Sequence, residues 1–161
     1  MLVISDCSPL RYLILVGRVE LLAKLYGRII IPSAVHKELN HGSAPEAVRR
    51  WSGALPPWVE VRTPKYNTPQ SAALDAGERE ALSLAVELQA DLVLLDEFEG
   101  RKIAAVMKLR FIGTVGVIVA AAQRNVLGNS EAADVMKALH QTNMRIAPQL
   151  IEDALAVIQD L

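Results

Sequence analysis

Short apolar runs alternate with longer stretches of helical periodicity along this chain, and this alternation constrains the fold more than any other feature. The runs Leu2 to Ser5 and Leu92 to Leu95 are too short for helices, and an aspartate follows each of them. Continuous apolar runs of this length are typical of strands that are covered on both faces. Between such runs, leucine, alanine and valine recur at helical spacing. The order strand, helix, strand implies a mostly parallel sheet, so the predicted class is α/β.

The same signals predict the individual elements. Five strands are expected, at Leu2 to Ser5, Arg28 to Ile31, Val59 to Val61, Leu92 to Leu95 and Phe111 to Ile112. Helices are expected in two pieces between Leu10 and Gly27, then at Ser33 to Leu39, Ala44 to Ala54, from Asp75 onward, at Glu97 to Lys108, at Thr114 to Asn125 and in two later stretches. We therefore expect a three-layer α/β/α fold with a mostly parallel central sheet of about five strands. Residues 1–161 are expected to form a single domain, with C-terminal helices from about residue 130 packed on it.

Composition excludes several classes of protein. The chain of 161 residues has a formal net charge of −1, which excludes proteins that hold nucleic acid by overall charge alone. Only 4% of the residues are aromatic, which argues against a broad base-stacking platform. No apolar run approaches the roughly 20 residues that cross a bilayer, and the first residues lack the basic leader of a signal peptide. Because the one cysteine, Cys7, cannot form an internal disulfide, we expect a cytoplasmic protein.

Two aspartates follow apolar strands. Asp6 ends the first predicted strand and Asp96 ends the fourth. Each could instead cap the helix that follows it, and for Asp6 taken alone that interpretation is the favoured one. In open parallel sheets, however, ligands bind beyond the carboxyl ends of the strands. Two carboxylates at the same edge of the sheet therefore make a candidate functional site.

Two glutamates on helices are further candidates. Glu38 shares a helix face with Val35, which points it inward, although a rotated helix would make it a surface charge. Glu78 and Glu80 are about 200° apart on a helix, so only one of them can face a given site. Glu78 lies at the N-terminal end of the apolar stripe and is the favoured candidate. Asp75 and Glu78 also have the spacing of a capping box, which would explain the pair without any site.

At these residues the chain resembles the PIN-domain nucleases, in particular their VapC-like group DUF3368. The resemblance runs through most of the chain and rests on five segments in the same order. They are ISDCSPL at Ile4, IPSAVHKEL at Ile31, LDAGEREAL at Leu74, DLVLLDE at Asp91 with Gly100 and Arg101, and IGTVGV at Ile112. Each segment alone is moderately specific, whereas five in the right order are strongly so.

The resemblance implies an acidic site. When the acidic positions of the family's motifs are carried over to this sequence, the catalytic and metal-binding carboxylates are Asp6, Glu38, Glu78 and Asp96. Ser8 would support the site near Asp6 with its hydroxyl group. Arg101 would contact the substrate backbone, unless it forms an ordinary salt bridge with Glu97, one turn earlier. Oxygen ligands favour Mg²⁺ or Mn²⁺ over Zn²⁺, and the three histidines have no paired zinc-ligand spacing.

The function that the resemblance implies is that of a metal-dependent endoribonuclease, which hydrolyses RNA phosphodiester bonds. It further implies the toxin of a toxin–antitoxin pair, a homodimer that is inhibited by a small antitoxin protein and has no membrane partner. Two departures from the family pattern bear on the outer hydrogen bonds of the site: Cys7 after the first acid, and Leu94 two residues before the last. The alternatives are a catalytically inactive PIN-like scaffold and a Mg²⁺-binding α/β regulatory module.

Overall fold

A five-stranded sheet forms the centre of the protein. The structure is a computed structural model that describes residues 1–161. Its strands are β1 (Val3–Ser5), β2 (Ile29–Pro32), β3 (Val59–Arg62), β4 (Leu92–Leu94) and β5 (Phe111–Ile112). They lie in the order β3-β2-β1-β4-β5, and all four pairings are parallel. The predicted five strands and α/β class are confirmed, and the sheet is wholly rather than mostly parallel.

The helices lie close to their predicted positions. They are α1 (Cys7–Leu15), α2 (Leu21–Tyr26), α3 (Ser33–Leu39), α4 (Glu46–Gly53), α5 (Ala76–Glu87), α6 (Phe98–Val106), α7 (Thr114–Gln123), α8 (Asn129–His140) and α9 (Pro148–Gln159). A short 3-10 helix, η1 (Pro69–Ser71), lies in the proline-rich stretch and was not expected. Gly27 ends α2 with a φ of 77°, a conformation that favours glycine. No helix is long and apolar enough to span a membrane.

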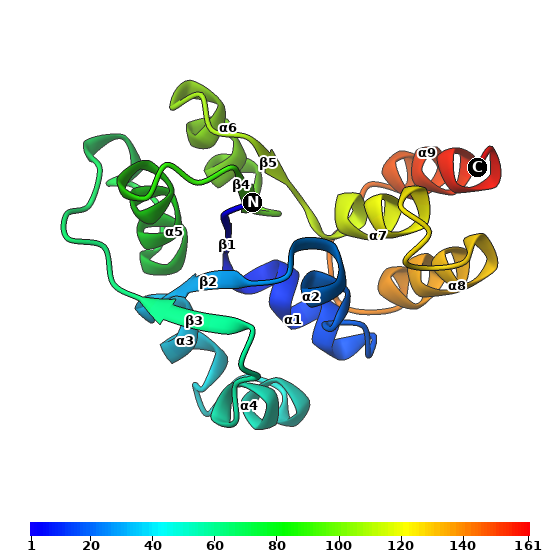
Figure 1. The fold of residues 1–161 in the computed structure, drawn as a ribbon, viewed down its shortest axis with the longest axis horizontal. Helices are drawn as coiled ribbons and strands as arrows, with labels where there is room; N and C mark the ends of the chain where they lie inside the picture. The colour runs from blue at the N-terminus through cyan, green and yellow to red at the C-terminus, as the bar shows by residue number, and fades with distance from the viewer.

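Alternate strand residues supply two separate hydrophobic cores. Val3 and Leu94 belong to a large buried cluster that also contains residues of α1, α2 and α7. Ile4 and Val93, their neighbours along the strands, belong to a second cluster with residues of α5 and α6. Because side chains of a strand alternate between the two faces of the sheet, helices cover both faces. The result is the predicted three-layer α/β/α arrangement (Figure 1).

The C-terminal helices pack against α7 at one end of the molecule (Figure 1). Met136 and Leu139 of α8 and Ile158 of α9 are fully buried in the same cluster as the core of α7. Helices α8 and α9 therefore share a hydrophobic core with α7. That residues 1–161 form a single domain stays a prediction.

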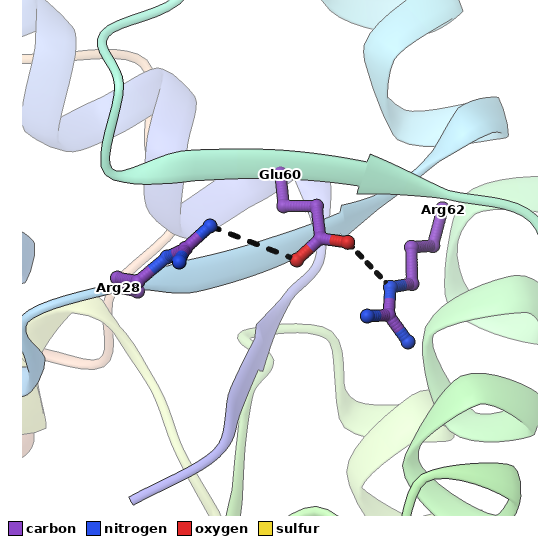
Figure 2. A network of polar contacts seen from close by, with 3 residues as sticks. All are labelled: Arg28, Glu60 and Arg62. Atoms are coloured by element: carbon purple, nitrogen blue, oxygen red, sulfur yellow. Dashed lines mark hydrogen bonds and ion pairs between the residues drawn. The ribbon is translucent and has the colours of Figure 1, made fainter.

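The edge strand β3 carries exposed charges. Glu60 Oε1 lies 2.6 Å from Arg62 Nε, and Glu60 Oε2 lies 4.0 Å from the guanidinium of Arg28, which precedes β2 (Figure 2). Such exposed pairs add at most about 1 kcal/mol of stability. Charges along an edge strand do, however, oppose the addition of a further strand.

Leu94 offers a test of the core on the α1 and α7 side of the sheet. Replacing this fully buried side chain by threonine leaves a void and buries a hydroxyl group among apolar atoms. We expect Leu94→Thr to lower the free energy of unfolding by about 2–4 kcal/mol, measured by urea denaturation. Val61→Thr on the edge strand, where Val61 is 36% exposed, is the control and should change it by less than about 0.5 kcal/mol.

Candidate functional site

The ends of β1 and β4 meet where the strand order reverses. Strand β1 lies between β2 and β4: the chain first adds β2 and β3 on one side of β1 and then returns to add β4 and β5 on the other side. Open α/β sheets bind ligands at such a switch point, outside the carboxyl ends of the strands. Asp6 follows β1 directly, and its backbone N–H donates to the carbonyl of Leu94, at 3.0 Å. Asp96 follows β4 by two residues, so the topology places both aspartates at this edge.

Three of the four predicted acids line one cleft of about 440 Å³, which we call the acidic cleft. Its lining includes Asp6, Glu38 and Glu78 together with Asp75, Glu97 and Glu99. Gly77, at the start of α5, is the point where two of the carboxylates meet. A Cβ atom there would lie 3.1 Å from Asp6 Oδ1 and 3.3 Å from Glu38 Oε2. Asp6 is only 4% exposed, whereas Glu38 is accessible from solvent.

Asp96 lies beside the acidic cleft rather than in it. It lines an adjoining groove of about 900 Å³, formed by β5, α6, α7, α9 and the segment 143–147. Thr114, the first residue of α7, donates both its backbone N–H and its hydroxyl to the Asp96 carboxylate, each at 2.7 Å. A Cβ atom on Gly113 would lie 2.6 Å from Asp96 Oδ1, so the carboxylate can approach only because this residue is glycine.

The choice between Glu78 and Glu80 has a structural explanation. Glu80 turns away from the acidic cleft and accepts hydrogen bonds from the Ser33 hydroxyl and the Ala34 backbone N–H, at 2.9 and 3.0 Å. It thereby caps α3 from the neighbouring helix α5. Glu78 lines the cleft instead. The Glu80 contact also fixes α3 against α5, which sets Glu38 opposite Glu78.

Like charges crowd the acidic cleft. Burial raises the pKa of Asp6 well above its usual value, and the nearby carboxylates of Asp75, Glu78 and Glu38 raise it further. Partial burial and the charge of Asp75 also raise the pKa of Glu38. The carboxyl groups of Asp6 and Glu38 are therefore harder to ionise than they would be in water.

Glu78 is the acid of the cleft whose hydrogen-bonding capacity is least satisfied. Burial, followed by the charge of Asp75, raises its pKa to about 7. Its Oε1 is buried and has no hydrogen-bond partner. A Cβ atom on Gly100 of α6 would lie 2.8 Å from this oxygen, so α6 holds it closely. A buried polar atom without a partner is costly, and in native proteins it often marks a place for a water molecule or an ion.

These carboxylates fit a divalent cation in their chemistry. All of them are oxygen donors, which favours a hard cation, and their raised pKa values would fall if a positive charge lay among them. As the side chains lie, however, no group of three acid, histidine or cysteine side chains is close enough to hold one ion. Binding of an ion therefore requires side-chain rearrangement within the acidic cleft.

The structure shows the surroundings of the two predicted supporting residues, Ser8 and Arg101. Burial raises the pKa of Asp96, and the hydrogen bonds from Thr114, the charge of Arg101 and the Ser8 hydroxyl lower it. Ser8 lines the acidic cleft together with Asp6, and its hydroxyl also acts on the Asp96 carboxylate. Arg101 forms no salt bridge with Glu97, because its guanidinium lies over the ring of Phe111, 5.1 Å from the centroid.

The two departures from the family pattern leave the acids supported. Leu94 belongs to the core, and Thr114 supplies the hydrogen bonds to Asp96 from another element. The buried Cys7 thiol hydrogen-bonds Glu38 and lowers the pKa of that carboxyl, against the larger effect of burial.

Three residues of the site were missed at the level of sequence. Asp75 is the N-cap of α5, as its spacing suggested, and accepts from the Glu78 backbone N–H at 2.9 Å, but it also lines the acidic cleft. Arg11 lines the same cleft from α1. Thr114 lies in the segment IGTVGV, and only its position after a strand hinted at a role.

The raised pKa of Glu78 makes the stability of the metal-free protein depend on pH. Since the carboxyl titrates near 4.5 when unfolded and near 7 when folded, the folded state holds the extra proton between these values. The free energy of unfolding should therefore fall by about 1–3 kcal/mol between about pH 5 and pH 8, measured by urea denaturation in EDTA. Glu78→Gln should remove much of this fall, whereas Glu152→Gln on the exposed part of α9 should not. A wild-type stability that rises over this range would contradict the assignment.

Thr114 should act on a bound ion through Asp96. Thr114→Val keeps the backbone hydrogen bond and the shape but removes the hydroxyl bond to Asp96 Oδ2. We expect its affinity for Mn²⁺ to fall about 10-fold, measured by calorimetric titration, because outer hydrogen bonds orient metal ligands. Thr114→Ser keeps the hydroxyl and should bind nearly as the wild type does. Equal affinities of the valine and serine variants would show that the hydroxyl has no such role.

Comparison with known proteins gives one match. A family model described as "DUF3368: PIN domain" matches residues 2–160, which includes every strand and helix of the fold. Searches of curated proteins and of solved structures gave no match.

Proposed function

The chain belongs to the PIN-domain family, as its motifs predicted, and from this premise we propose that it is a metal-dependent endoribonuclease. PIN domains are generally nucleases, which hydrolyse phosphodiester bonds. The proposal goes further and assigns RNA as the substrate and Mg²⁺ or Mn²⁺ as the cofactor. It also assigns the chemistry to four carboxylates, those of Asp6, Glu38, Glu78 and Asp96.

The observation that carries the proposal is the uncompensated charge at the carboxyl edge of the sheet. Asp6 is nearly inaccessible yet surrounded by acids, and Glu78 has a buried oxygen without a partner. A protein that needed this cluster only for stability would gain by replacing it with apolar residues. A cluster of acids with raised pKa values at the switch point of the sheet is typical of a catalytic site.

The residues have distinct tasks in this mechanism. When bound, a divalent ion would neutralise the phosphate, lower the pKa of a water molecule and so supply the nucleophile. Asp6 and Glu38, which meet beside Gly77, would hold it together with Glu78. Asp96, fixed by Thr114, would complete the set from the groove side. Without an ion, the raised pKa of Glu78, about 7, leaves this carboxyl partly protonated near neutral pH.

The biological setting is proposed on the resemblance alone. A VapC-like protein would be the toxin of a toxin–antitoxin pair, would act on cellular RNA in the cytoplasm as a homodimer, and would be inhibited by a small antitoxin. The rival is a catalytically inactive PIN-like scaffold, which the absence of a preformed three-ligand group favours. Cleavage assays separate the two.

Asp6→Asn should abolish cleavage. The substitution removes one central carboxylate charge while keeping the shape of the side chain, so the rate on single-stranded RNA with Mn²⁺ should fall by at least about 100-fold. The fold should persist, because the variant relieves repulsion in the metal-free cleft, and its thermal unfolding midpoint should be no lower than that of the wild type. Asp134→Asn, on the exposed surface of α8, is the matched control and should cleave normally. Undiminished cleavage by Asp6→Asn would contradict the assignment of the site to these acids.

The metal requirement can be measured directly. EDTA should stop RNA cleavage by the wild-type protein, and an excess of Mg²⁺ or Mn²⁺ should restore it, because the ligands are all oxygens. Mn²⁺ should also raise the thermal unfolding midpoint of the wild type, and it should raise that of Asp6→Asn much less. Cleavage that persists in EDTA would contradict the proposed mechanism.

A further inference from the structure

The acidic cleft opens into a second hollow on each side. On one side lies a basic hollow of about 380 Å³, lined by Arg11, Lys37 and His41, which shares Arg11 and Glu38 with the cleft. On the other side lies the groove of about 900 Å³, which shares Ser8, Tyr12, Glu97 and Phe98 with the cleft. Because each of the two hollows shares lining residues with the cleft, the three adjoin one another, and we call them together the track.

Cationic side chains that form no salt bridge lie at both ends of the track. Arg11 and Lys37 line the basic hollow, and Arg101 and Arg145 line the groove. None of the four forms an ion pair in the structure. The Nε of Arg11 is buried and has no hydrogen-bond partner. Guanidinium groups bind phosphate oxygens well, so unpaired arginines on both sides of a carboxylate cluster are suited to a chain of phosphates.

The exposed aromatic ring of Phe98 lies at the boundary between the acidic cleft and the groove. Phe98, the first residue of α6, is 74% exposed and lines both hollows. Beyond it the groove has an apolar wall that includes Met144 and Ile146. Unpaired bases bind proteins by stacking on aromatic rings, and a base in this position would cover the exposed face of Phe98.

We propose that the track binds single-stranded RNA, so that the strand crosses the acidic cleft and continues into both neighbouring hollows. This inference rests on the proposed function, which it deepens. Arg11 and Lys37 contact phosphates on one side of the scissile bond, Arg101 and Arg145 contact phosphates on the other, and Phe98 stacks on a base next to it. Because the strand leaves the cleft in both directions, cleavage is internal. A duplex cannot present an unstacked base to Phe98 and is excluded.

RNA fits the groove better than a protein segment does, although much of the groove is apolar. The groove shares four lining residues with the acidic cleft, so a strand held in the groove lies beside the carboxylates. Its arginines are unpaired, whereas its acid on α9, Asp153, already accepts a hydrogen bond from Gln149 at 2.8 Å. A protein partner is the competing occupant of the groove. Titration of the protein with single-stranded RNA distinguishes between RNA and a protein partner.

Binding can be measured apart from cleavage. In EDTA, a fluorescent single-stranded RNA of about ten nucleotides is titrated with the intact protein over a range of salt concentrations. Arg11→Ala/Lys37→Ala and Arg101→Ala/Arg145→Ala should each raise Kd about tenfold at low salt. Each should also reduce the slope of log K against log salt by about 1.4, since each lost phosphate contact removes about 0.7. The control, Arg28→Ala/Arg110→Ala, removes two exposed arginines that precede β2 and β5 at the opposite edge of the sheet, and it should change Kd less than about twofold.

The stacking contact has its own pair of variants. Phe98→Leu keeps an apolar side chain but loses the aromatic face, so Kd should rise about fivefold or more. Phe98→Trp should bind RNA as well as the wild type does. Tyr66→Ala is the control, because Tyr66 is 84% exposed and lines none of the three hollows.

The outcomes separate this inference from the proposed function. If the track variants bind and cleave like the wild type while Asp6→Asn is inactive, the function stands, the track is wrong, and the groove is left for a protein partner. If duplex RNA binds as tightly as a single strand, the track is also wrong. If RNA binding responds to the variants as expected but no metal restores cleavage, the track stands and the proposed enzymatic activity is wrong.

Discussion

Repulsion among carboxylates at one edge of a parallel sheet is the constraint on which the rest of this structure depends. Asp6 is buried at the end of the central strand, and the charges of Asp75, Glu78 and Glu38 all raise its pKa. The ionised forms of Asp6, Glu38 and Glu78 would be more stable in water, so the folding energy must come from the two hydrophobic cores on either side of the sheet. The cores hold the acids in place without neutralising them, which leaves the charge available to a cation.

The scaffold fixes the acids through contacts between distant segments. Glu80 on α5 caps α3, so the two helices that carry Glu78 and Glu38 are held together. Thr114 at the start of α7 holds Asp96 by two hydrogen bonds, across 18 residues of sequence. These side chains need not touch a substrate. They reduce the freedom of the carboxylates, which is the contribution that outer residues make to metal sites in general.

The elements and residues that could be predicted from the sequence are those whose local pattern is compatible with only one structure. Each strand was predicted within about one residue because short apolar runs between turn residues have few alternatives. Helical periodicity separated Glu78 from Glu80, and the structure places only Glu78 in the acidic cleft. The effect of Ser8 on Asp96 was not predicted, because a hydroxyl two residues after Asp6 gives no local sign that it also faces the neighbouring strand end. The role of Thr114 was missed, because nothing near it in the sequence marks Asp96 as its partner.

The sequence by itself determined the α/β class, the parallel sheet, the family and the four acids that make up the candidate site. These follow from periodicity along the chain and from short motifs, both of which are local. Only the tertiary structure decided that Asp96 faces a separate groove, that Arg101 lies over Phe111, and that cations border the acidic cleft on both sides. The physical reason is that burial, charge interaction and the shape of a cavity depend on which distant segments pack together. A residue's own neighbours in the sequence do not specify those contacts.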